Sequence, residues 1–239
     1  MTSTLLMLAD GRFPSGSHAH SGGLEAAVAA GRVRTLSDVE RFLQGRLATA
    51  GSVMAAFAAA AHQAVSAPHP ETLAGLEVEL DARMSAAAVR LAGLEVELDA
   101  RMSAAAVRAA SRRQGKALAR AGRLTWPSPI HVALVKEPHH AIALGVVAAA
   151  AGLSDHDGAL TAAYGVVTGP ASAAVRLLGL DPYAVQAILA RLAPATDEVA
   201  NAAVIEAKRP PEDLPDWAAP LSDIAAEHHA TWEVRLFAS

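Results

Sequence analysis

Residues 13–25 read FPSGSHAHSGGLE and stand out from the alanine- and leucine-rich sequence around them. The glycines in this stretch allow backbone angles that are closed to other residues, and Pro14 fixes one backbone angle and removes a hydrogen-bond donor. Ser21 stands where a helix N-cap is expected, ahead of good helix formers at 24–30, and Gly31 follows them in the usual C′ position. The stretch predicts a shaped loop that leads into a short helix.

The composition around this loop favours helices. Hydrophobic residues make up 52% of the chain and aromatic residues only 4%, and alanine dominates. Alanine is the strongest helix former, and few runs of β-branched residues are present to build strands. The 239 residues are enough for one sizeable core. We therefore predict an all-α fold, a single-domain bundle of about eight to ten helices over residues 1–239.

Several classes of protein are disfavoured by the composition. The chain has no cysteine, which removes disulfides, thiolate nucleophiles and cysteine-based metal sites. A net charge of −4 offers no basic footprint for nucleic acid. The N-terminus lacks the basic region of a signal peptide, and the longest apolar run, 141–153, is shorter than the ~20 residues that span a bilayer. We expect a cytoplasmic protein that binds neither nucleic acid nor membrane.

Helix boundaries can be predicted at several points. Residues 37–40 match a capping box, Gly51 interrupts the helix that follows, and 53–65 is apolar enough for a buried helix. Further along, Asp155 or Asp157 is expected to cap a helix.

Proline marks the next boundaries. Asp181 and Pro182 start a helix that reaches Leu192, and Pro194 is expected to separate it from a helix over 196–208.

An 18-residue segment occurs twice in tandem, at 73–90 and at 91–108. Eighteen residues make about five turns of α-helix, so the second copy is expected to keep every side chain on the same helix face, with Ala87 and Ala105 in register. Two units are too few for a solenoid. We interpret the pair as a duplication in which the second copy holds the natural position and the first is surplus.

The C-terminal region contains a proline-rich linker at 209–220, then a helix that Ser222 is expected to cap, and then RLFAS at 235–239. Leu236 and Phe237 are apolar groups with no evident core to enter. Such residues at a terminus either dock onto a partner or fold back onto their own domain, and the sequence leaves both open.

Candidate metal ligands are His18 and His20, because imidazole suits nickel, zinc or copper. Two ligands rarely make a tight site, so the alternative is a pair of loop histidines that bond to the backbone or pack. The pair at 139–140 is expected to cap a helix or lie on the surface. The pair at 228–229 points in two directions from one helix and is expected to be solvated or to meet a partner.

Two further polar residues have two interpretations each. Glu25, near a helix N-terminus, is either favoured by the helix dipole or organises the loop for a partner. Arg176 lies among apolar residues and needs a partner, either in an internal salt bridge or across a subunit interface, where Tyr183 is expected nearby.

The stretch FPSGSHAHSGGLEAAVAAGRV, residues 13–33, resembles the N-terminal signature of the UreF family, the urease accessory proteins. SRRQG at 111–115 and RLFAS at 235–239 resemble two further family stretches. The resemblance implies an all-helical, dimeric protein without catalytic activity that bridges the UreD/UreH scaffold and the GTPase UreG while nickel is delivered to the urease apoprotein. It implies no tightly bound cofactor and at most transient nickel.

The resemblance also implies which residues contact partners. His18 and His20 stand where many members have aromatic residues, and Ala238 stands where many have arginine. The implied partner-binding residues are Pro14, Gly16, Ser21, Gly23, Glu25, Gln114, Arg176, Tyr183, Arg235, Leu236, Phe237 and Ser239.

Two other functions are alternatives. The first is a metal-dependent enzyme that uses His18, His20 and a distant third ligand, although the chain has no phosphate-binding loop and no HExxH motif. The second is a helical interaction module unrelated to urease.

Overall fold

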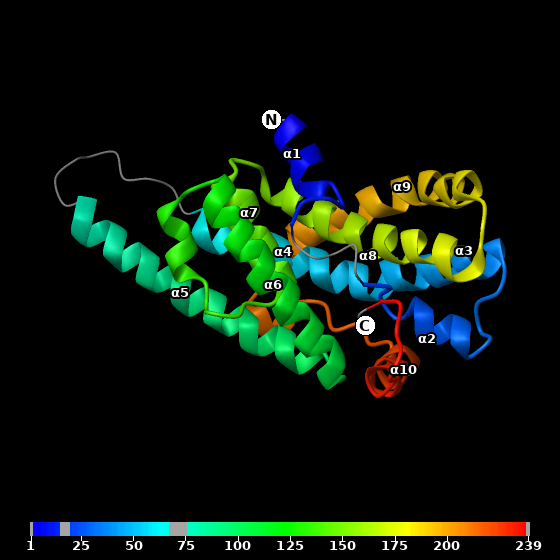
Figure 1. Ribbon diagram of the computed structural model, residues 1–239. Coiled ribbons are helices and arrows are strands. Elements are labelled where there is room, and N and C mark those ends of the chain that lie inside the picture. Colours follow the sequence, from blue (N-terminus) through cyan, green and yellow to red (C-terminus); the bar gives the residue numbers. More distant parts are fainter. Residues whose placement is uncertain (1, 15–19, 67–75, 238–239) are drawn as a thin grey trace.

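The computed structural model describes residues 2–14, 20–66 and 76–237, and over these ranges the chain forms α-helices, short 3₁₀ and π segments and connecting loops, without a β-strand (Figure 1). The predicted all-α fold is confirmed. No helix in the described ranges is long and apolar enough to cross a membrane. The helices are α1 (Thr2–Ala9), α2 (Leu24–Ala29), α3 (Leu36–Arg46), α4 (Ser52–Val65), α5 (Leu76–Arg101), α6 (Ala105–Thr125), α7 (His140–Ala150), α8 (Asp155–Leu178), α9 (Pro182–Glu206) and α10 (Pro220–Ala230).

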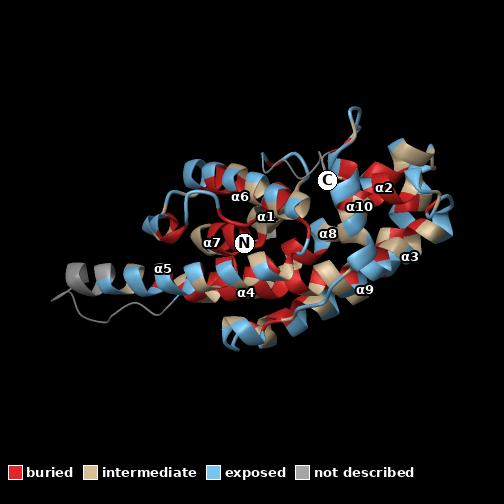
Figure 2. Cartoon of the chain, turned by 90° about the horizontal axis from the view of Figure 1, so that it is seen from below, coloured by how far each residue is buried: buried red, intermediate tan, exposed pale blue. Residues whose placement is uncertain are grey.

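Helix α4 forms the centre of the fold, as its apolar sequence predicts. Ten of its 14 residues are buried, and α5, α7, α8 and α9 pack around it (Figure 2). Small residues allow α4 and α7 to lie close together. A Cβ atom placed on Gly145 of α7 would lie 2.1 Å from the carbonyl oxygen of Ala58. The absence of a side chain at Gly145 therefore sets how closely these two helices pack.

The helix starts differ from the predicted caps because side chains nearby in sequence make better hydrogen bonds. Helix α3 is capped by Thr35, whose Oγ1 accepts from the Asp38 N–H at 3.2 Å while the Asp38 carboxylate accepts from the Thr35 N–H at 2.9 Å. The predicted box at 37–40 is two residues too late. Helix α8 has the same reciprocal pair in Ser154 and Asp157, so Asp157 completes the box and Asp155 is not the cap.

Two more predicted caps are wrong, and neither helix has a side-chain cap. Ser21 is buried below the start of α2, where its hydroxyl accepts from the Glu25 N–H at 3.3 Å, and Gly23 in the left-handed region, with φ 88°, is the N-cap. Helix α10 begins at Pro220 rather than after Ser222, since proline at the first helical position needs no hydrogen-bond acceptor. Gly31, with φ 68°, does end α2 as predicted.

Two predicted interruptions do not break the helices. Gly51 lies at the end of a π-helical turn, Leu47–Gly51, that joins α3 directly to α4. Pro194 lies inside α9, which runs from Pro182 to Glu206. Both Pro194 and Ala190, whose carbonyl loses its partner at the proline, are exposed, so water can hydrogen-bond to that carbonyl.

The two identical copies adopt different structures. Helix α5 contains the described part of the first copy and continues into the second, where Leu91, Leu94 and Leu98 are buried. The helix then ends at Arg101, and 102–104 is non-helical, whereas the same three residues of the first copy, 84–86, are helical. The two copies are therefore not in register throughout: Ala87 is buried and Ala105 is exposed. In Figures 1 and 2 the first part of α5 extends past the other helices.

The contacts of Arg101 explain why the second copy differs in structure from the first. Its guanidinium donates to the carbonyl oxygens of Glu212, Leu214 and Pro215 at 2.9, 3.1 and 3.1 Å, and it lies over the Phe57 ring at 5.4 Å. These bonds hold the proline-rich segment before α10 against the core. A second contact fixes the start of α6, where the Glu227 carboxylate accepts from the Ala106 N–H at 2.9 Å.

We expect Arg101→Ala to lower the free energy of unfolding by at least about 2 kcal/mol, because several carbonyl groups lose a charged donor. Arg113 is exposed on α6 and lies outside the contact with 211–215, so Arg113→Ala is a control with a smaller expected loss. Urea unfolding of both variants measures the difference. Equal losses would show that the contacts of Arg101 with the linker are not stabilising.

Candidate functional site

The C-terminal tail folds back onto α2 through one carboxylate. Glu25 is buried, with 7% of its surface exposed, and accepts hydrogen bonds from the backbone N–H groups of Leu236 at 2.8 Å and Phe237 at 3.0 Å. Its second oxygen also lies 2.9 Å from Nε2 of His229 in α10. Three hydrogen bonds to one buried carboxylate compensate its loss of water. Figure 1 shows the C-terminus beside α2 and α10.

The tail buries Phe237 and leaves the three residues before it exposed. Phe237 is buried, and the guanidinium of Arg176 lies 5.1 Å above its ring. Leu236 is 71% exposed and Val234 is 83% exposed. Arg235 is exposed as well, so Phe237 is the residue that anchors the described end of the tail. Helix α10 adds two exposed apolar residues, so the docking strip consists of Leu221, Ile224, Val234 and Leu236.

The predicted site residues fall into separate groups. Gly16, His18 and Ser239 lie outside the described residues. Four of them meet at the tail: Glu25, Arg176, Leu236 and Phe237. The hydroxyl of Ser21 accepts a hydrogen bond from the Glu25 N–H. Pro14 and Arg235 are exposed.

Arg176 interacts with an aromatic ring, and among the described residues it makes no internal salt bridge. Tyr183, 84% exposed on the first turn of α9, has no described hydrogen bond or ring contact with the tail.

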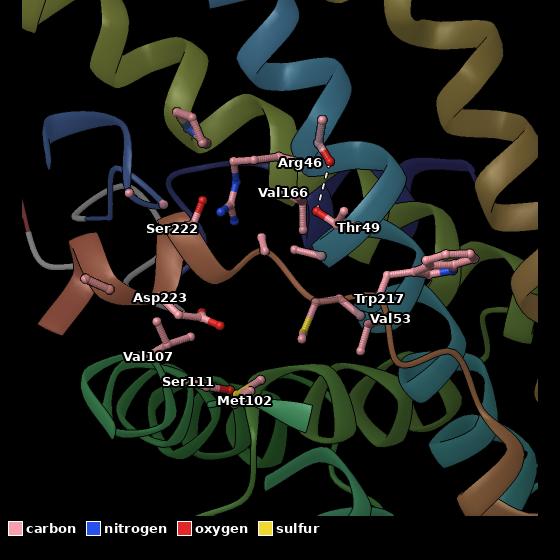
Figure 3. Close-up of a pocket in the computed structure, with 18 of the residues that line it drawn as sticks. Arg46, Thr49, Val53, Met102, Val107, Ser111, Val166, Trp217, Ser222 and Asp223 are labelled. Carbon is pink, nitrogen blue, oxygen red and sulfur yellow. Dashed lines mark hydrogen bonds between the residues drawn. The ribbon is translucent and has the colours of Figure 1, made fainter. Parts of the chain in front are cut away.

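Gly23, His20 and Gln114 line a cavity of about 610 Å³ between α3, the α5–α6 junction, α8 and α10 (Figure 3). His140 lies in the same lining, and burial together with the nearby His20 lowers the pKa of His140 to about 4. No three acidic or histidine side chains come together in a possible metal site within 2–14, 20–66 and 76–237. Metal binding by His18 and His20 remains a prediction, since His18 lies outside these ranges.

The predictions for the two histidine pairs are confirmed only in part. His139 occupies the N-cap position of α7, as predicted, but its side chain makes no capping hydrogen bond, and His228 is exposed while His229 is buried. His139 is fully buried: Nδ1 lies 3.0 Å from Ser111 Oγ and Nε2 lies 3.0 Å from an Asp99 oxygen. Burial and the neighbouring Arg112 lower the pKa of His139 to about 4, so its ring is neutral near pH 7. Burial raises the pKa of Glu95, which accepts from the His139 N–H, to about 6.

A serine, a histidine and an aspartate thus lie in hydrogen-bond contact, as they do in hydrolases. The Ser111 hydroxyl, however, is buried and also accepts from the His140 N–H at 3.2 Å. The Ser111 hydroxyl and the Glu95 carboxylate, which accepts from the His139 N–H, therefore satisfy the backbone N–H groups at the start of α7. The arrangement supports the position of α7 against α6. Gly115 of α6 allows α6 to lie against the start of α7, since a Cβ on Gly115 would lie 2.0 Å from the carbonyl oxygen of Pro138.

Sequence reasoning missed His229 and Arg101. His229 is 2% exposed and bonds to a residue 204 positions away, and no local pattern indicates such a pairing. Arg101 belongs to a segment whose exact copy makes different contacts, so the sequence offered no basis for choosing between the two. The signal that the sequence offered for the Phe237 site was the pair of apolar residues Leu236 and Phe237 close to the C-terminus.

Fold and site together define an all-helical protein whose outstanding features are an anchored, partly apolar tail and a cavity behind it. The sequence model of the UreF family matches residues 33–193. The chain is 42% identical to the urease accessory protein UreF of Mycobacterium sp. strain JLS, over 99% of this chain and 98% of that one. It is 40% identical to the protein of the same name from Mycolicibacterium vanbaalenii, over the same shares, and 40% identical to that from Mycobacterium marinum, over 98% and 97%. The chain belongs to the UreF family of urease accessory proteins.

Proposed function

We propose that this chain is a non-catalytic cytoplasmic protein that bridges the UreD/UreH scaffold and the GTPase UreG while nickel is inserted into the urease apoprotein. The observation that supports this role is the docking strip. Leu221, Ile224, Val234 and Leu236 are each 68–83% exposed on α10 and the tail, where Glu25 holds the backbone in one position. Exposed apolar groups on a fixed backbone suit protein binding, because little chain entropy is lost when a partner binds.

The proposal assigns different surfaces to different partners. The docking strip binds the scaffold partner. Tyr183, which is 84% exposed on α9, contributes to a homodimer contact away from the tail. Nickel passes only transiently, with His18 and His20 as its candidate ligands, and no cofactor is held tightly.

We expect Leu236→Ser to weaken capture of purified UreD/UreH by about tenfold or more, because an exposed apolar anchor at a protein interface commonly contributes 2 kcal/mol or more, roughly a 30-fold effect. Deletion of 235–239 should abolish capture and leave the circular dichroism spectrum helical. Val96→Ser, at a residue 68% exposed on α5, is the matched control and should bind normally. Full capture by Leu236→Ser and by the deletion would rule out docking through the tail.

A further inference from the structure

The cavity between α3, the α5–α6 junction, α8 and α10 has the size and lining of a ligand site. Its volume of about 610 Å³ falls within the roughly 300–1,000 Å³ of known small-molecule pockets. Its walls are mainly apolar, as such pockets are. The apolar lining includes Phe42, Val53, Met54, Met102, Val107 and Val166.

One cation in the lining lacks the partner that its neighbours have. Arg41 pairs with Asp38 at 2.5 Å, and Arg101 pairs with Glu97 and with backbone carbonyls. Arg46 forms no ion pair within the described part of the chain, and its Nε is buried without a hydrogen-bond acceptor there. Burial lowers the pKa of Arg46 to about 10, which still leaves the guanidinium charged at neutral pH.

The guanidinium is held in place and points into the cavity. A Cβ atom on Gly22 would lie 3.1 Å from Cζ and from Nη2 of Arg46, so the group packs on the backbone of Gly22. Figure 3 shows Arg46 entering from α3, with Met102 and Ser111 on the opposite wall. A charged group that is buried without a partner is costly, and arginine pairs well with a carboxylate, often in a bidentate arrangement.

The other polar groups of the lining do not supply that anion. Thr49 uses its hydroxyl to donate to Gly45, at 2.8 Å, and Ser111 is committed to His139 and His140. Asp223 is the carboxylate in the lining, and within the described residues no ion pair joins it to Arg46. Among the described residues, no group of the lining therefore neutralises Arg46.

We propose that the cavity binds a small carboxylate with an apolar body, whose carboxylate pairs with Arg46 and whose apolar part packs between Val107 and Val166. Nothing in the accessory role above requires such a ligand, so the site is a separate property of the chain. Occupation of the site would join α3, α6 and α10, the helices that surround it, and would stabilise the fold by mass action.

Calorimetric titration with octanoate, and with octan-1-ol as the neutral comparison, tests the proposal. We expect saturable binding of octanoate by the full-length protein and at least about tenfold weaker binding of octanol, since a hydrogen bond to a charged group contributes about 1.5–3 kcal/mol. Arg46→Met should reduce octanoate affinity to that of octanol. Arg191→Met, at a surface arginine paired with Glu40 outside the cavity, should not.

The duplicated segment supplies a second, matched pair of variants. Val107 lines the cavity, and Val89, with the same sequence around it, is 73% exposed on α5. Val107→Phe should fill the cavity and abolish octanoate binding, whereas Val89→Phe should bind as the unsubstituted protein does. If Arg46→Met does not fold, the comparison of Val107→Phe with Val89→Phe still tests whether octanoate binds in the cavity. Absence of saturable octanoate binding, equal binding of octanol, or unchanged binding by Val107→Phe would each overturn the proposal.

Discussion

Replacing Glu25 with glutamine is expected to release the C-terminal tail from α2. The carboxylate accepts from Leu236 N, Phe237 N and His229 Nε2, and an amide in its place offers one acceptor oxygen and turns an NH₂ group toward the remaining donors. Each hydrogen bond to a charged group contributes about 1.5–3 kcal/mol, so the tail should lose most of what holds it.

Hydrogen exchange of the Leu236 and Phe237 amides measures the release. Loss of about 1.5–3 kcal/mol corresponds to roughly 10- to 150-fold faster exchange at these two positions, with the helical core unaffected. Capture of UreD/UreH should fall in parallel if a fixed docking strip is what binds. Glu233→Gln is the control, because Glu233 is exposed and close to the tail in sequence. Unchanged protection in Glu25→Gln would mean that Phe237 and its ring contact with Arg176 hold the tail without the carboxylate.

Gly145→Ala is expected to cause the largest loss of stability of any single substitution proposed for this chain. The added Cβ would lie 2.1 Å from Ala58 O, 2.8 Å from His62 N and 2.9 Å from Ala61 Cβ, and the first two are backbone atoms that can move only if α4 and α7 separate. Overpacking a core commonly costs about 1–3 kcal/mol, and a clash with the backbone of the central helix should reach or exceed the upper figure.

Gly165→Ala provides the contrast, because a Cβ on Gly165 of α8 meets nothing within 4 Å. Alanine is the better helix former by about 1 kcal/mol, so this variant should be as stable as the unsubstituted protein or more stable. Urea unfolding of both variants gives the comparison. A similar change in the free energy of unfolding for the two glycines would show that the contact between α4 and α7 relaxes easily.

The sequence alone determined the class of fold and much of the helix content. Alanine-rich segments such as 53–65 became buried helices, and Gly31 ended α2, because helix propensity and positive φ angles are local properties. Predicted boundaries failed where the deciding hydrogen bond lay a few residues away, as for Thr35 with Asp38, or where an exposed proline such as Pro194 was tolerated.

Tertiary structure alone decided what the duplicated segment and the tail do. Met84 and Met102 have the same neighbours over several residues on each side, yet one is helical and the other is not. The difference follows from contacts that only the second copy reaches, those of Arg101 with the segment before α10 and of Glu227 with the start of α6. Glu25 and His229 likewise meet across 204 positions. A charged group can be buried only where the folded chain supplies hydrogen-bond partners, and the local sequence does not indicate partners that are distant along the chain.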